Sequence, residues 1–134
     1  MKAQAALEYM IIVAIVFTFI IPIWSHLATV NESSQQSLSI SQAQNAARKI
    51  TSAADLVWAQ GPPAMLTIDV YIPEGVASAR MQNTSVIFTL YFGAGSTTDV
   101  ASTSIGPLNG SLPTNEGLYK FVVRANTTFV NVTY

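Results

Sequence analysis

A long uncharged segment near the start of this chain constrains its fold more than any other feature. From Tyr9 to Val30 the sequence contains no Asp, Glu, Lys or Arg, and residues 11–21 would be hydrophobic on every side of a helix. At about 1.5 Å per residue, the segment approaches the roughly 20 residues that cross a hydrocarbon layer of about 30 Å. A single carboxylate, Glu8, lies at its edge. Because a carboxylate is costly in a lipid-facing helix, Glu8 invites a functional explanation.

Three interpretations of this segment compete. A secretory signal has a charged start, an apolar core and a small-residue cleavage site after the core, and residues 25–28 make a poor site of that kind. A single-span membrane anchor explains the hydrophobicity but not the carboxylate. The third interpretation is a helix that first spans a membrane and later buries the same face against copies of itself. Only this interpretation explains both features.

The start of the chain resembles archaeal type IV pilins with a class III signal peptide. In that family a short leader containing Lys precedes a Gln-x-x-x-Glu element and a hydrophobic helix, matched here by Lys2, Gln4, Glu8 and the apolar segment. The resemblance implies that residues 1–3 are a leader, which a membrane prepilin peptidase removes between Ala3 and Gln4. It is close only over residues 1–30.

The resemblance also assigns roles inside the helix. Residues 4–30 would span the membrane and later form the filament core, and Glu8 would set the assembly register by meeting the N-terminal amine of a neighbouring subunit. A buried carboxylate is tolerated when it is paired. The alternative is a Glu8 held at the level of the lipid headgroups. The predicted filament-core residues are Met10, Ile11, Val13, Ile15, Phe17, Phe19, Ile20, Pro22 and Trp24.

Helical spacing continues beyond the apolar segment as an amphipathic extension over residues 31–60. Gly61-Pro62-Pro63 ends the pattern, so we expect one long helix from about Ala5 to about Ala59, with Pro22 as a position where it could break. A separate surface helix joined by a Ser/Gln linker is the alternative. The apolar positions that recur at threes and fours are Leu38, Ala43, Ala46, Ala47, Ile50, Ala54 and Val57.

The period changes to two after Pro63, which predicts a small antiparallel β-sandwich over residues 64–134. The expected fold class is therefore α+β, a long N-terminal hydrophobic helix followed by a β head, which is also the layout that the resemblance to type IV pilins implies. A loop rich in Pro, Gly and Asn is expected over residues 106–117. The expected strands cover residues 66–72, 76–80, 85–92, 99–105, 118–124 and 128–134.

Five Asn-x-Ser/Thr sequons occur although the chain has only seven Asn residues. All follow the apolar segment, on the side that would face the exterior if Lys2 stays inside. We interpret them as acceptors of an N-glycan coat that compensates for a surface with few charges. The sequon positions are Asn31, Asn83, Asn109, Asn126 and Asn131.

Composition argues against catalysis and against nucleic-acid binding. The net charge is −1 and the six Lys and Arg residues are scattered, so there is no basic surface for nucleic acid. There is no Cys and only one His, and the carboxylates show no close spacing typical of a metal or acid–base site. We therefore expect no enzyme activity, no cofactor and no bound metal.

The sequence as a whole favours a structural subunit of an archaeal type IV adhesion pilus. The resemblance implies a helical homo-oligomer, a prepilin peptidase, and an assembly ATPase with its membrane platform as partners. The precursor would be inserted in the cell membrane and the assembled filament would be extracellular. Two alternatives remain: an archaellin-like subunit of a motility filament, and a single-span membrane-anchored extracellular binding module.

Overall fold

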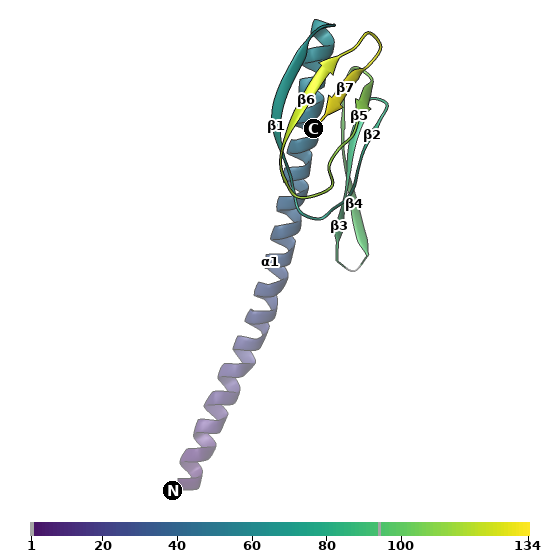
Figure 1. The fold of residues 1–134 in the computed structure, drawn as a ribbon. Coiled ribbons are helices and arrows are strands. Elements are labelled where there is room, and N and C mark those ends of the chain that lie inside the picture. The colour runs from purple at the N-terminus through teal and green to yellow at the C-terminus, as the bar shows by residue number, and fades with distance from the viewer. Residues whose placement is uncertain (1, 94) are drawn as a thin grey trace. The chain divides into compact units, whose positions relative to one another are not determined.

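The computed structural model describes residues 2–93 and 95–134, except for the side chains of Lys2, Ala3, Ala28, Asn31 and Glu32. In the described chain one helix is followed by strands in two sheets, which confirms the predicted α+β layout (Figure 1). The chain divides into two compact units, an N-terminal unit (Met1–Gln36) and a C-terminal unit (Ser37–Tyr134). The elements are α1 (Lys2–Gln60), β1 (Met65–Ile72), β2 (Val76–Gln82), β3 (Ser85–Phe92), β4 (Ser96–Thr103), β5 (Leu108–Gly110), β6 (Gly117–Ala125) and β7 (Val130–Thr133).

Helix α1 contains Pro22 and has helical residues on both sides of it. It ends where the sequence predicted. Gly61 has a φ of +70°, and its N–H donates to the carbonyl oxygens of Val57 (3.1 Å) and Trp58 (3.2 Å). Glycine adopts this left-handed conformation without steric cost, so it satisfies carbonyls that the helix end would otherwise leave unpaired.

The strands form a four-stranded sheet in the order β1-β6-β7-β5 and a three-stranded sheet in the order β2-β3-β4. All pairings are antiparallel except that of β5 with β7, which is parallel. The prediction of a purely antiparallel head is therefore wrong at this edge, and residues 106–117 are not entirely a loop. Strand β5 has only three residues. A strand that short shows no measurable alternation, and its pairing with β7 is a long-range contact.

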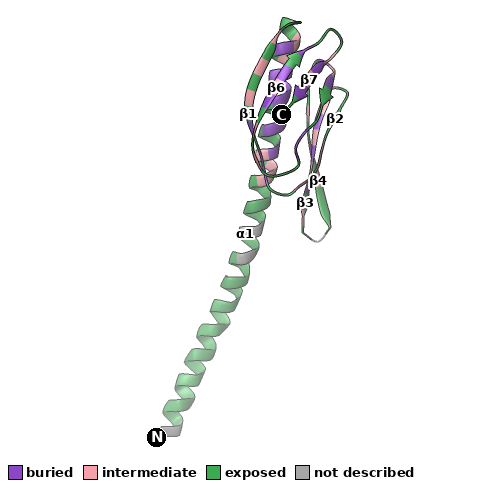
Figure 2. Cartoon of the chain, viewed as in Figure 1, coloured by how far each residue is buried: buried purple, intermediate pink, exposed green. Residues whose placement is uncertain are grey.

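The core of the C-terminal unit lies between the two sheets and the second half of α1 (Figure 2). Phe88 in β3 and Phe121 in β6 are fully buried, and so is Ile50 in the helix. Of the predicted helical stripe, Leu38 is the exception, because it is 54% exposed. The buried helix residues are Ala43, Ala46, Ala47, Ile50, Thr51, Ala53, Ala54 and Val57.

Helix α1 contacts the end strand of each sheet. Lys49 Nζ donates to the carbonyl oxygen of Asp69 in β1 at 3.0 Å, and the Thr51 and Ser102 hydroxyl oxygens, from α1 and β4, lie 2.9 Å apart. At the opposite side the sheets meet directly, because β2 lies against β5, and the Leu108 N–H donates to the carbonyl oxygen of Asn83 (2.6 Å), in the turn between β2 and β3. The helix therefore closes the one open side between the two sheets.

Candidate functional site

The residues that the sequence marked as functional fall mainly in the apolar part of α1. The segment Gln4–Leu27 is long and apolar enough to cross a membrane, and none of it is buried within the described chain. All the predicted filament-core residues are exposed, including Phe17 (56%) and Trp24 (75%). By length and composition this is an N-terminal helix that could anchor in a membrane or serve as a signal sequence.

Two hydroxyl side chains in this segment, those of Thr18 and Ser25, donate hydrogen bonds to the backbone of the helix itself. The hydroxyl of Thr18 donates to the carbonyl oxygen of Ala14 at 2.8 Å, and that of Ser25 donates to the carbonyl oxygen of Pro22 at 3.0 Å. A hydroxyl bonded to its own helix carries no unmet donor into hydrocarbon. These two residues are therefore compatible with a lipid environment.

Glu8 is exposed and lies one helical turn after Gln4, on the same face. Both ion pairs between described side chains are in the C-terminal unit, Arg80–Asp99 (4.0 Å) and Lys120–Asp69 (3.4 Å), and neither involves Glu8. The predicted cleavage position joins Ala3, whose side chain lies outside the described residues, to the exposed Gln4. The register role of Glu8 and the cleavage therefore stay predictions.

Four of the five predicted glycan acceptors can be placed in the C-terminal unit. Asn83 is exposed in the turn between β2 and β3, with a φ of +52°, and Asn126 is exposed in the turn after β6. Asn109 is exposed in β5, and Asn131 is half-buried in β7. The side chain of Asn31 lies outside the described residues.

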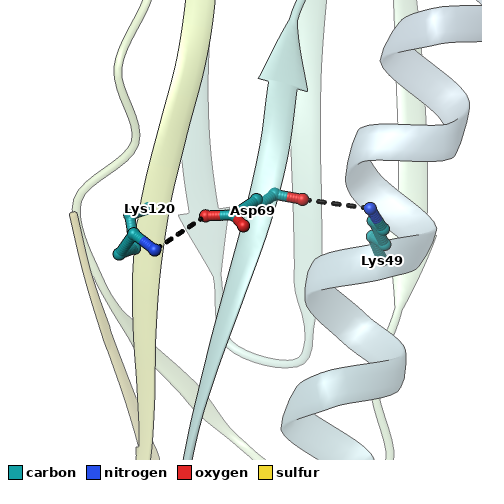
Figure 3. Close-up of polar contacts among 3 residues, drawn as sticks. All are labelled: Lys49, Asp69 and Lys120. Atoms are coloured by element: carbon teal, nitrogen blue, oxygen red, sulfur yellow. Dashed lines mark hydrogen bonds and ion pairs between the residues drawn. The ribbon is translucent and has the colours of Figure 1, made fainter.

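The structure also reveals polar links between α1 and the sheets that the sequence did not indicate. Asp55 Oδ1 accepts from the Ser104 hydroxyl (2.6 Å) and from the backbone N–H of Ile105 (2.7 Å). On the other side of the helix, Asp69 joins two lysines: its carbonyl accepts from Lys49 and its carboxylate pairs with Lys120 (Figure 3). The partners lie far apart in the chain, so no local pattern could reveal these contacts.

A shallow groove of about 250 Å³ runs between α1 and β1. Beside it, the Tyr71 hydroxyl donates to Glu116 Oε1 at 2.6 Å. This hydrogen bond to a carboxylate raises the pKa of the Tyr71 phenol above its ordinary value. Among the residues that the structure describes there is no cluster of His, Cys, Asp or Glu able to hold a metal ion. The groove is lined by Gln42, Asn45, Ala46, Lys49, Val70 and Tyr71.

Comparisons with protein-family models, with curated proteins and with solved structures find no match to this chain.

Proposed function

We propose that this protein is a structural subunit of an archaeal type IV adhesion pilus. Its precursor is inserted in the cell membrane through α1, and prepilin peptidase cuts it between Ala3 and Gln4. The assembly machinery then moves the subunit from the membrane into an extracellular filament. In the filament, the apolar part of α1 packs against the same part of other subunits.

The observation that carries the proposal is the contrast between the two parts of α1. Residues 43–57 bury one face in the core of the C-terminal unit, whereas the predominantly apolar span Gln4–Leu27 has no buried residue within the described chain. An apolar surface of that size is not stable in water, so lipid or other protein chains must cover it. A filament subunit is covered by lipid while it is in the membrane and by neighbouring subunits after it has assembled.

Glu8 favours assembly over a permanent anchor. Within the described side chains it has no ion pair, and burial of an unpaired carboxylate is strongly unfavourable. The N-terminal amine of a neighbouring subunit would supply the opposite charge at a fixed axial position. Lipid and neighbouring helices are about equally apolar, so a polar contact of this kind selects the assembled register.

The C-terminal unit suits an exposed position on a filament. Its outward residues include many hydroxyl and amide side chains and several sequons. Repetition of such a unit along a polymer would give weak individual contacts a high combined avidity. An archaellin-like subunit would share this plan, and a single-span binding module would not polymerise.

The test combines N-terminal peptide mass spectrometry of sheared surface material with electron microscopy of the same fraction. We expect filaments whose subunits begin at Gln4. In parallel, Glu8→Ala and Glu8→Gln should abolish or strongly reduce filaments, while the control Glu74→Ala, at an exposed turn of the β unit, should assemble normally. Chains that begin at Met1 and stay with the membranes would contradict the proposal, as would normal filaments from Glu8→Ala. Filaments that rotate and drive swimming would identify the archaellin-like alternative.

A further inference from the structure

Two of the sequons lie side by side on one face of the four-stranded sheet. Asn109 in β5 is the in-register partner of Asn131 in β7, and the two strands are parallel. Neighbouring strands are about 4.8 Å apart, and in-register residues point to the same face of a sheet. The flanking residues Leu108 and Val130 are buried, so both asparagines lie on the outward face.

Both side-chain amides are chemically free to react. No hydrogen bond among the described residues uses the amide of Asn109 or of Asn131 as donor or acceptor. On its other side Asn131 is paired in register with Arg124 of β6, whose side chain is exposed on the same face. Asn131 therefore has a neighbouring strand on each side, whereas Asn109 is in the end strand of the sheet.

We propose that Asn109 and Asn131 form one exclusive N-glycan acceptor, so that a folded chain carries a sugar on one of them and never on both. The inference rests on the proposed export of this unit. In the transfer, the Asn amide nitrogen loses a proton and bonds to the anomeric carbon of a lipid-phosphate-linked oligosaccharide. The bond from that carbon to the phosphate oxygen breaks, and the lipid phosphate leaves with the electron pair.

Exclusion follows from the strand spacing. A sugar ring with its hydroxyl groups is wider than the gap between neighbouring strands, so the first sugar on one amide covers the other. A sugar on Asn131 that leans away from β5 would lie over Arg124, its in-register neighbour on β6, whose guanidinium is turned toward β1 and donates to Met65 Sδ at 3.5 Å. Asn109 is the more exposed of the two and should carry most of the glycan in the unaltered chain. Asn131 should take over when Asn109 is removed.

The experiment counts glycans on full-length chains that keep only two sequons. The pair chain carries Asn31→Gln, Asn83→Gln and Asn126→Gln, and so retains Asn109 and Asn131. The control chain carries Asn131→Gln in place of Asn126→Gln, and so retains two acceptors that are not register partners. Intact-mass spectrometry of each chain from the filament-producing cells should show one glycan on the pair chain and two on the control chain.

Chains with a single sequon complete the test. Removal of either Asn109 or Asn131 from the pair chain should leave one glycan on the other residue. Two glycans on the pair chain would overturn the inference. A chain whose single sequon is Asn131 and that carries no glycan would also overturn it, because Asn131 would then be inaccessible to the transferase whether or not Asn109 carries a sugar. The absence of glycans from every chain would overturn it as well. The pilin proposal is judged separately, by filaments and by the N-terminus at Gln4 in the same cells.

Discussion

The contact between Asp55 and the two residues that follow β4 tests how α1 is held in the C-terminal unit. One carboxylate oxygen accepts two short hydrogen bonds, from the Ser104 hydroxyl (2.6 Å) and the Ile105 N–H (2.7 Å). Ser104 is 4% exposed, so its hydroxyl has little access to water. Replacement of Asp55 by Ala removes the acceptor and leaves a buried donor without a partner.

The two hydrogen bonds contribute unequally to the free energy of unfolding. A hydrogen bond to a charged group contributes about 1.5–3 kcal/mol, and most of that is lost when the remaining partner stays buried. Ile105 is 81% exposed, so water can replace the bond from its N–H, and only the Ser104 bond counts in full. We therefore expect Asp55→Ala to lower the free energy of unfolding by about 2–3 kcal/mol, and Asp55→Asn, which keeps an acceptor oxygen, by about 1 kcal/mol.

Denaturant unfolding of the full chain in detergent micelles measures this change. The chain has two Trp residues, and Trp24→Phe leaves Trp58 as the only reporter. Trp58 is half-buried in the C-terminal unit, so its fluorescence follows the loss of packing there. A double-mutant cycle with Ser104→Ala would isolate the energy of the hydrogen bond itself.

The matched control is Asp99→Ala, which removes an exposed carboxylate that pairs with Arg80 at 4.0 Å. An exposed ion pair contributes about 0–1 kcal/mol, so this variant should unfold almost as the parent does. If Asp55→Ala lowers the free energy of unfolding no more than Asp99→Ala does, the buried Ser104 hydroxyl does not depend on Asp55 as its acceptor.

Three further predictions concern the C-terminal unit. A Cβ at Gly106 would lie 2.6 Å from the Trp58 ring. Gly106→Ala should therefore lower the free energy of unfolding by about 1–3 kcal/mol in the same assay, and an unchanged unfolding midpoint would contradict this prediction. Gly110 has a φ of +149°, and a Cβ there would lie 1.9 Å from the Val132 carbonyl oxygen. Gly110→Ala should therefore lower the free energy of unfolding by more than about 1 kcal/mol, and the backbone amides of β5 should exchange hydrogen faster. The hydrogen bond to Glu116 raises the pKa of Tyr71 above 10.0, so the bond stabilises the fold below pH 10 and is lost as pH rises through the folded-state pKa. In an ultraviolet titration, Glu116→Gln should lower the pH at which the Tyr71 phenol ionises, and Tyr71→Phe should remove that ionisation.

Several parts of the fold could be predicted because their signals are local. The apolar segment and the Gly61-Pro62-Pro63 sequence fix the helix and its end, and the observed α1, Lys2–Gln60, agrees with them. Alternating residues predict the strand that the structure has at Met65–Ile72, and a run of β-branched and aromatic residues predicts the one at Ser85–Phe92. Both signals are local, because they depend only on the residues of the element itself.

Other features depend on residues that meet only in the folded chain. The sequence by itself determined an apolar helix with Glu8 at its edge, an amphipathic continuation and a β-rich unit, because periodicity and the helix-ending residues act locally. Tertiary structure alone decided that β5 pairs in parallel with β7, that Asn109 stands beside Asn131, and that Asp55 reaches Ser104. These contacts join residues 22 and 49 positions apart, and which distant partners meet is set by how the two sheets and the helix share one core.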